Sequence, residues 1–300
     1  MNQTDKNEVE QCIEILAYFT IFRHPLTILE FEELADRKNS QSALNELITK
    51  EVIQIVDGYI LVNGLTNVAD IENRKSFEKN CLKQHHQVLR NSKLISKFPF
   101  VRGIGISGSV SKGIMKDDGD IDFFIITANN RLWVSRTFLI LYKKLFRLNS
   151  RKFFCLNYFI SESRLEIPDQ NIFTATEIIF LSPTFGKEVF KSFKSSNSWV
   201  NENFPNRKNP INFGMIPQRK YFLKRTLEKI LNGKLGEKLD QRFMRITHKR
   251  WQKKFPNFTD KEMELAMRSN RNVSKHHPNN FQTKVLKELD KRIEQLKKKL

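Results

Sequence analysis

The sequence predicts an α+β fold for this chain of 300 residues, and two observations lead to that prediction. Three apolar runs, over residues 101–109, 120–127 and 152–161, are typical of buried strands, and an amphipathic segment over 131–146 is typical of a helix. Helical patterns dominate the regions on both sides of this run. The β-β-α-β run is therefore expected to form the α+β core of the chain.

Residues 1–66 are predicted to form three helices followed by a hairpin. The expected elements are a helix over 9–22, a helix over 28–35 that Thr27 caps, a third helix that Asn39 or Ser40 caps, and two short strands around Asp57-Gly58. This order of elements resembles a winged helix-turn-helix.

The charge distribution bears on what each region can bind. Residues 1–66 hold 5 Lys and Arg against 11 Asp and Glu, whereas residues 216–300 hold 24 against 9. Neutralisation of phosphates supplies most non-specific DNA affinity, so the acidic N-terminal unit favours protein docking or a structural role over DNA binding. The basic C-terminal region fits a polyanionic partner such as nucleic acid or nucleotide phosphate.

Three further parts follow the N-terminal unit. Residues 67–97 are expected to form one long polar helix, residues 98–205 the core domain, and residues 206–300 a basic helical region. Within these parts, helices are expected over 172–183 and 184–200, with interruptions later at Gly233, Gly236, Pro256 and Pro278. Cys81, His85 and His86 could be metal ligands, but a solvated helix face explains them as well.

Composition and cysteine usage exclude several classes of protein. No apolar run approaches the roughly 20 residues of a membrane-spanning helix, and the polar N-terminus is unlike a secretory signal. The three cysteines, Cys12, Cys81 and Cys155, are too far apart for a disulfide framework. We expect a cytoplasmic protein without membrane contact.

One segment, GISGSVSKGIMKDDGDIDFFII, has a pattern typical of phosphate chemistry. A strand ends at Gly108-Ser109, where free backbone N–H groups could bind phosphate. Asp120 and Asp122 begin the next strand and are expected on one face of it, about 7 Å apart. Paired carboxylates beside a phosphate-binding turn indicate Mg²⁺-assisted phosphoryl or nucleotidyl transfer, although a turn and a surface acid remain the alternative.

The segment resembles the DNA polymerase β-like nucleotidyltransferase superfamily, whose hallmark is Gly-Ser, a spacer of this length and Asp-x-Asp. The whole chain is also similar to an uncharacterised bacterial group with an N-terminal winged-helix-like unit. The resemblance implies a nucleotidyltransferase core, a mixed β-sheet with flanking helices. It also implies transfer of a nucleoside monophosphate from an NTP to an acceptor, with release of pyrophosphate.

The resemblance assigns a role to each motif residue. Gly108 and Ser109 would contact the triphosphate, and Lys112 could neutralise its charge or be a solvated loop lysine. Asp120 and Asp122 would hold two Mg²⁺ ions, for which Mn²⁺ could substitute. The NTP is the expected substrate. The acceptor, an RNA end, a small molecule, a sugar or a protein hydroxyl, stays open.

The sequence departs from the family pattern at Asn157, where a third acidic residue is usual. An amide oxygen can ligate Mg²⁺ but cannot act as a general base. Glu177, or a base on the acceptor, could take that role. Two hypotheses therefore stand, an active nucleotidyltransferase and a non-catalytic nucleotide sensor or scaffold with a degenerate site. His276-His277 could line a nucleotide pocket or belong to a capped turn.

Overall fold

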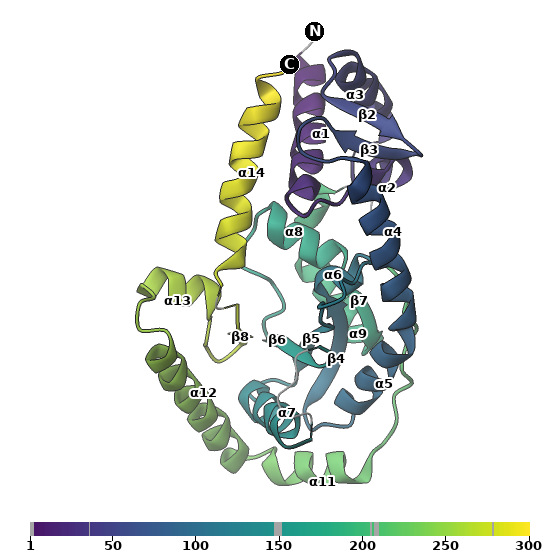
Figure 1. Cartoon of the computed structure of the whole chain (residues 1–300). Coiled ribbons are helices and arrows are strands. Elements are labelled where there is room, and N and C mark those ends of the chain that lie inside the picture. Colours follow the sequence, from purple (N-terminus) through teal and green to yellow (C-terminus); the bar gives the residue numbers. More distant parts are fainter. Residues whose placement is uncertain (1–2, 36, 147–151, 205, 207–209, 278) are drawn as a thin grey trace.

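A five-stranded mixed sheet forms the centre of the molecule in the computed structural model (Figure 1), which describes residues 3–35, 37–146, 152–204, 206, 210–277 and 279–300. The strand order is β7-β4-β5-β6-β8. The strands are β4 (Val101–Ser107), β5 (Asp122–Thr127), β6 (Cys155–Ser161), β7 (Ser182–Phe185) and β8 (Val273–Lys275). The pair β5–β6 is parallel and the other pairs are antiparallel, so the α+β class and the mixed sheet are confirmed.

Both faces of this sheet are buried, and alternation along β5 decides which residues lie on each face. Phe123 and Ile125 belong to one apolar cluster with Trp133 of α7 (Leu132–Phe146), the helix that joins β5 to the parallel strand β6. Phe124 and Ile126 belong to a second cluster on the opposite face, against α9 (Lys187–Ser196). Asp122 shares the face of Phe124.

The N-terminal unit consists of three helices and a small antiparallel sheet with the order β1-β3-β2. Its elements are α1 (Gln3–Ile21), β1 (Leu26–Thr27), α2 (Ile28–Leu34), α3 (Arg37–Thr49), β2 (Ile53–Val56) and β3 (Tyr59–Val62). Thr27 caps α2 in a capping box with Glu30, and Asp57-Gly58 turns the hairpin, as predicted. The prediction that Asn39 or Ser40 caps the third helix is wrong, since α3 begins at Arg37.

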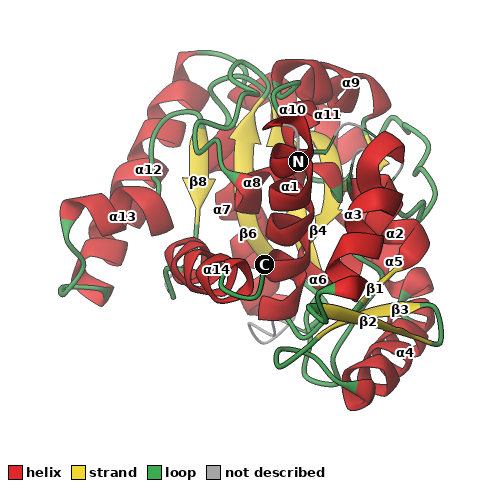
Figure 2. Ribbon diagram, turned by 90° about the horizontal axis from the view of Figure 1, so that it is seen from above, coloured by secondary structure: helices red, strands yellow, loops and turns green. Residues whose placement is uncertain are grey.

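The core of the N-terminal unit is shared with later parts of the chain. Apolar residues of α8 (Ile172–Ile179) and α14 (Phe281–Lys297) are buried together with those of α1, among them Ala175 and Leu289. The ring of Phe19 packs edge-on against that of Phe180, with centroids 6.3 Å apart. The helix α14 runs alongside α1 (Figure 1), and the view from above places α8 next to both (Figure 2).

The predicted single helix over 67–97 is wrong, because α4 (Val68–Lys83) ends before α5 (His85–Ile95) begins. At the junction the backbone N–H of Gln84 bonds to the carbonyl of Cys81, three residues earlier, which tightens the last turn of α4. Cys81 is buried, whereas His85 and His86 are exposed.

Two strands lie where helices were expected. β7 divides the segments 172–183 and 184–200, and its Pro183, which has no N–H to donate, is tolerated because β7 is an edge strand. β8 adds a second edge from within the basic C-terminal region. Only three residues long and polar in the middle, β8 has no apolar pattern that marks it in the sequence.

The remaining elements are helical. They are α6 (Gly108–Ser111), α10 (Val200–Asn203), α11 (Phe222–Leu231), α12 (Lys234–Lys254) and α13 (Asp260–Ala266). The predicted breaks at Gly233 and Pro256 coincide with the start and end of α12. The break expected at Gly236 is wrong, because Gly236 lies inside α12, where a Cβ would meet the carbonyl oxygen of Leu231. Pro278 lies outside the described residues.

Among the described residues, no helix has both the length and the apolar character needed to cross a bilayer.

Candidate functional site

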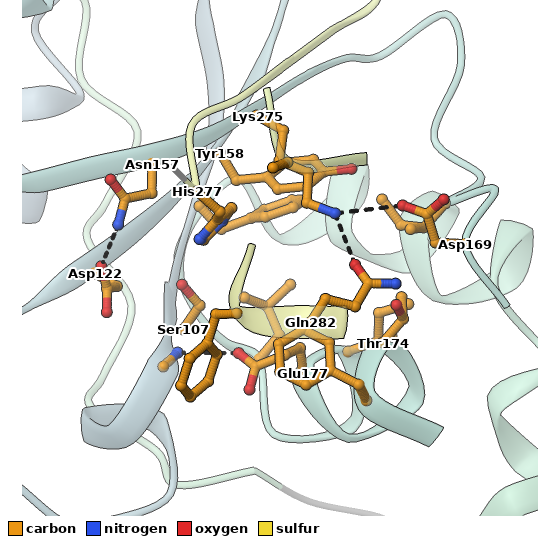
Figure 3. Close-up of a pocket in the computed structure, with 18 of the residues that line it drawn as sticks. Ser107, Asp122, Asn157, Tyr158, Asp169, Thr174, Glu177, Lys275, His277 and Gln282 are labelled. Atoms are coloured by element: carbon orange, nitrogen blue, oxygen red, sulfur yellow. Dashed lines mark hydrogen bonds and ion pairs between the residues drawn. The ribbon is translucent and has the colours of Figure 1, made fainter. Parts of the chain in front are cut away.

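A cavity of about 130 Å³ lies over the sheet face that bears Asp122 and Phe124 (Figure 3). The sheet, α8 and the segment from α13 to α14 enclose it. One end is formed by Ser107, Gly108, Asp122, Asn157 and Glu177, and the other by Asp169, Lys275 and Gln282. Apolar and aromatic side chains line the space between the two ends.

Two carboxylates and a thiol meet beside the first end, where Asp122 lines the cavity. The ligand atoms of Asp120, Asp122 and Cys155 all lie within 4.8 Å of one another. β5 begins at Asp122, not at Asp120 as expected, so Asp120 reaches this position from the preceding turn instead of by alternation along the strand. The two predicted carboxylates are therefore close together as expected, but Asp120 lies before β5 and not in it.

Burial and the neighbouring carboxylate of Asp120 perturb the titration of Asp122. Burial, and next the negative charge of Asp120, raise the pKa of Asp122 to about 7, against the smaller opposing effect of Lys112. A cation between the two carboxylates would remove this repulsion. The end of the cavity is therefore short of positive charge.

Asp122 approaches the backbone of Gly108 so closely that only glycine fits at position 108. The Gly108 φ of 67° lies in the left-handed region, and a Cβ on Gly108 would come within 2.5 Å of the Asp122 Oδ2 atom. Ser107 pairs directly with Asp122 across β4 and β5. The turn after β4 and the carboxylate at the start of β5 therefore fit together only with glycine at this position.

Lys112 and Glu177 form an ion pair beside this turn. The Lys112 ammonium is 2.6 Å from Glu177 Oε1 and donates to the Gly108 carbonyl at 3.2 Å, and the Gly108 N–H donates to Glu177 Oε2 at 3.3 Å. The carboxylate of Glu177 thus accepts hydrogen bonds from two donors, an N–H and an ammonium. Both donors are of the kind that binds a phosphate oxygen. Ser109 lies in the same turn but does not line the cavity.

A β-bulge places Asn157 beside Asp122. Phe123 pairs with Leu156 and Phe124 pairs with Tyr158, which leaves Asn157 as the extra residue of β6. The bulge turns both Asn157 and Tyr158 toward the cavity. The Asn157 side-chain amide donates to Asp122 Oδ1 at 2.9 Å, so its own oxygen is the atom left for a cation.

Cys155 belongs to the site but was not predicted from the sequence. Its position follows from register, because Cys155 pairs with Asp122 across the parallel strands β5 and β6. Burial and the two carboxylates raise the pKa of the Cys155 thiol far above its usual range. The thiol therefore stays protonated and contributes no charge.

The donor set fits a hard divalent cation. The carboxylates of Asp120 and Asp122, with the amide oxygen of Asn157, are the oxygen ligands that Mg²⁺ and Mn²⁺ prefer, whereas a protonated thiol is a poor ligand for either. Cys81, His85 and His86 do not form a comparable group among the described residues.

The far end of the cavity contains residues that the sequence does not mark. Lys275 of β8 donates to the side-chain oxygen of Gln282 at 2.8 Å and lies 3.4 Å from Asp169. His277, one of the two histidines considered earlier, also lines the cavity, and burial lowers its pKa to about 4, so it is neutral. These residues come from segments far apart in the sequence.

No family model, curated protein or solved structure matches this chain.

Proposed function

We propose that this chain binds a nucleoside triphosphate with Mg²⁺ and transfers its nucleoside monophosphate to an acceptor hydroxyl. The supporting observation is the close approach of the Asp122 carboxylate, which lies beside Asp120, to Gly108, whose carbonyl accepts from the Lys112 ammonium. Ligands for a cation and groups that suit phosphate oxygens thus lie together at one end of a single cavity, which Gly108 and Asp122 line. A nucleoside triphosphate with bound Mg²⁺ supplies both the cation and the phosphate oxygens in one ligand.

In the proposed reaction the acceptor oxygen forms a bond to the α-phosphorus, and the bond from that phosphorus to the bridging oxygen breaks, so that pyrophosphate leaves. Asp120 and Asp122, with Asn157, would hold the cations, which stabilise charge on the attacking and leaving oxygens. Gly108, Ser109 and Lys112 would position the phosphates. The acceptor's proton goes either to Glu177 or to a base on the acceptor, since Asn157 cannot take it.

The acceptor stays open among an RNA end, a small molecule, a sugar and a protein hydroxyl. The α12 helix favours testing a polyanion, because it exposes a series of basic side chains: Lys234, Lys238, Arg242, Arg245, Lys249, Arg250, Lys253 and Lys254.

A second candidate function is nucleotide sensing without turnover. It is favoured by Asn157, an amide hydrogen-bonded to Asp122 where a third carboxylate would complete the site, and by Glu177, whose carboxylate is engaged by Lys112. In that case the nucleotide and cation would bind at the same residues and stay intact.

The decisive experiment is transfer of label from α-labelled NTPs in the presence of Mg²⁺ or Mn²⁺. The full chain is offered each NTP with total RNA, a small-molecule extract or a protein mixture, and Asp122→Ala is compared with Asp118→Ala. Asp118 is the matched control, because it is an exposed acid in the turn that precedes β5. We expect transfer by the wild type and by Asp118→Ala, and a loss of at least about 100-fold in Asp122→Ala.

Other outcomes divide the two candidates. Cation-dependent nucleotide binding without transfer, lost in Asp122→Ala, would support the sensor. Full transfer by Asp122→Ala, or no nucleotide binding by the wild type, would refute both functions at this site.

A further inference from the structure

We propose that the far end of the cavity holds the base of the nucleotide and selects uracil, with Lys275 and Gln282 contacting the base's carbonyl oxygens. This inference rests on the proposed function, because it takes the phosphates to lie at Asp122 and Gly108. It adds the identity of the substrate, which neither the motif nor the resemblance supplies.

The middle of the cavity is a slot with aromatic walls. On the sheet side the rings of Phe124 and Tyr158 stack, with centroids 5.2 Å apart and an interplanar angle of 22°. Phe173 of α8 and Phe281 of α14 also line the cavity, with centroids 6.0 Å apart and an angle of 69°. Flat apolar surfaces of this kind fit a planar ring, since every base has a π-face that stacks on aromatic side chains.

The register of the sheet places this slot next to the carboxylates. Phe124 pairs with Tyr158, and Tyr158 pairs with Lys275, so these three residues form one row across β5, β6 and β8. This row lies two residues along the strand from Asp122, a step of about 7 Å on the same face. A molecule with its phosphates at Asp122 and Gly108 therefore extends its body along this row toward Lys275 (Figure 3).

The far end offers hydrogen-bond donors. Arg268 holds Asp169 through two bonds of 2.9 and 3.2 Å, and the Lys275 ammonium shares that carboxylate at 3.4 Å. Two buried cations, Arg268 and Lys275, thus face one half-buried carboxylate, while Glu264, the other partner of Arg268, is 63% exposed. The Tyr158 hydroxyl is buried and has no hydrogen-bond partner among the described residues. A ligand group at this end must accept hydrogen bonds.

The hydrogen-bond donors at the far end favour one base. Adenine and cytosine present an amino group, a donor, where uracil, like thymine, presents a carbonyl oxygen. Guanine has a carbonyl oxygen but also an amino group. Among the four bases of the ribonucleotides, uracil alone combines carbonyl acceptors with no amino group.

The test measures the affinity of the full chain for the four α,β-methylene nucleoside triphosphates with Mg²⁺, by calorimetry. Inorganic tripolyphosphate is measured in parallel to report the phosphate end alone. We expect the uridine compound to bind at least tenfold more tightly than the adenosine compound. In Lys275→Met this preference should fall below threefold, while tripolyphosphate affinity stays unchanged.

Two further variants keep the result interpretable. Lys284→Met removes an exposed lysine of α14 and should retain the full preference. Tyr158→Phe removes only the unpartnered hydroxyl and should reduce the preference for uridine without loss of fold, which the thermal unfolding midpoint checks. It provides the test if Lys275→Met fails to fold.

The outcomes distinguish this inference from the function on which it rests. Equal binding of all four nucleotides, a preference for a purine, or a uridine preference that survives in both Lys275→Met and Tyr158→Phe would overturn the inference and leave the proposed function standing. Absence of binding by every nucleotide and by tripolyphosphate would overturn both.

Discussion

The two ends of the cavity have opposite charge and different construction. At one end Asp120 and Asp122 repel each other, and the nearest cation, Lys112, is already paired with Glu177. At the other end Lys275 and Arg268 share one half-buried carboxylate, that of Asp169. The first end needs a cation and the second needs acceptor atoms. Because the two ends differ in charge and an apolar stretch separates them, the cavity fits a ligand in one orientation only.

The largest effect on the rate of transfer should come from Gly108→Ala, which adds a methyl group at the acidic end of the cavity. Gly108→Ala places a Cβ 2.5 Å from Asp122 Oδ2, in a left-handed backbone conformation. The carboxylate must move, and a displacement of about 1 Å at a reacting centre costs on the order of 100-fold in rate. We expect that loss in the transfer assay, together with an unchanged base preference from the far end.

Gly214→Ala is the matched control for this variant. Gly214 has a φ of 88°, but a Cβ there meets nothing within 4 Å. It therefore imposes the backbone cost, about 1–2 kcal/mol, without the collision. Equal loss of transfer in both variants would show that backbone strain, and not the contact with Asp122, is responsible.

Burial of Asp122 and its repulsion from Asp120 should also appear in the pH dependence of stability. Native Asp122 holds its proton up to about pH 7, whereas the unfolded chain releases it near the ordinary pKa of 3.8. Between these values the native state binds more protons, so this group lowers stability as the pH rises. Asp122→Asn should then be more stable than the wild type at pH 8, by on the order of 2 kcal/mol without divalent cations, and about equal at pH 4.

Urea unfolding of the two proteins across this pH range provides the measurement. A stability difference that does not change with pH would mean that Asp122 is ionised throughout. Mg²⁺ should reduce the difference at pH 8, because it stabilises only the wild-type carboxylate pair.

The smallest effect, on nucleotide affinity, concerns Glu177, whose carboxylate is bonded to the two donors proposed to bind the phosphates. Glu177→Gln keeps the shape of the side chain but weakens its hold on Lys112 and on the Gly108 N–H. We expect about a fivefold gain in nucleotide affinity, roughly 1 kcal/mol, and an unchanged maximal rate of transfer. The exposed Glu166→Gln is the control. A lower maximal rate at unchanged affinity would instead make Glu177 the proton acceptor.

The acidic end could be foreseen from the sequence because residues 107–122 form one continuous segment: the end of β4, the short helix α6, a turn and the start of β5. Their spacing in the sequence nearly fixes their spacing in the fold. Even so, Cys155 was missed, since its place depends on how β6 aligns with β5. The bulge at Asn157 was missed for the same reason. Register between strands far apart in the sequence leaves no local pattern.

The far end could not be foreseen. Asp169, Lys275 and Gln282 come from a loop, a three-residue edge strand and the first turn of a helix, and each is unremarkable in its own segment. Lys275 in particular belongs to a basic region whose charged residues are mostly solvent-exposed, and only pairing of β8 with β6 buries it. Tertiary assembly, and not local preference, determines this part of the cavity.

The core that α1 shares with α8 and α14 has a consequence for how a ligand enters and leaves. α8 and α14 line the cavity on one face, with Glu177 and Gln282, and are packed against α1 on another. Because close-packed interiors resist deformation, these helices cannot separate to widen the entrance unless their packing on α1 also shifts. Widening of the cavity is therefore coupled to the packing of α1, which lies outside the cavity itself.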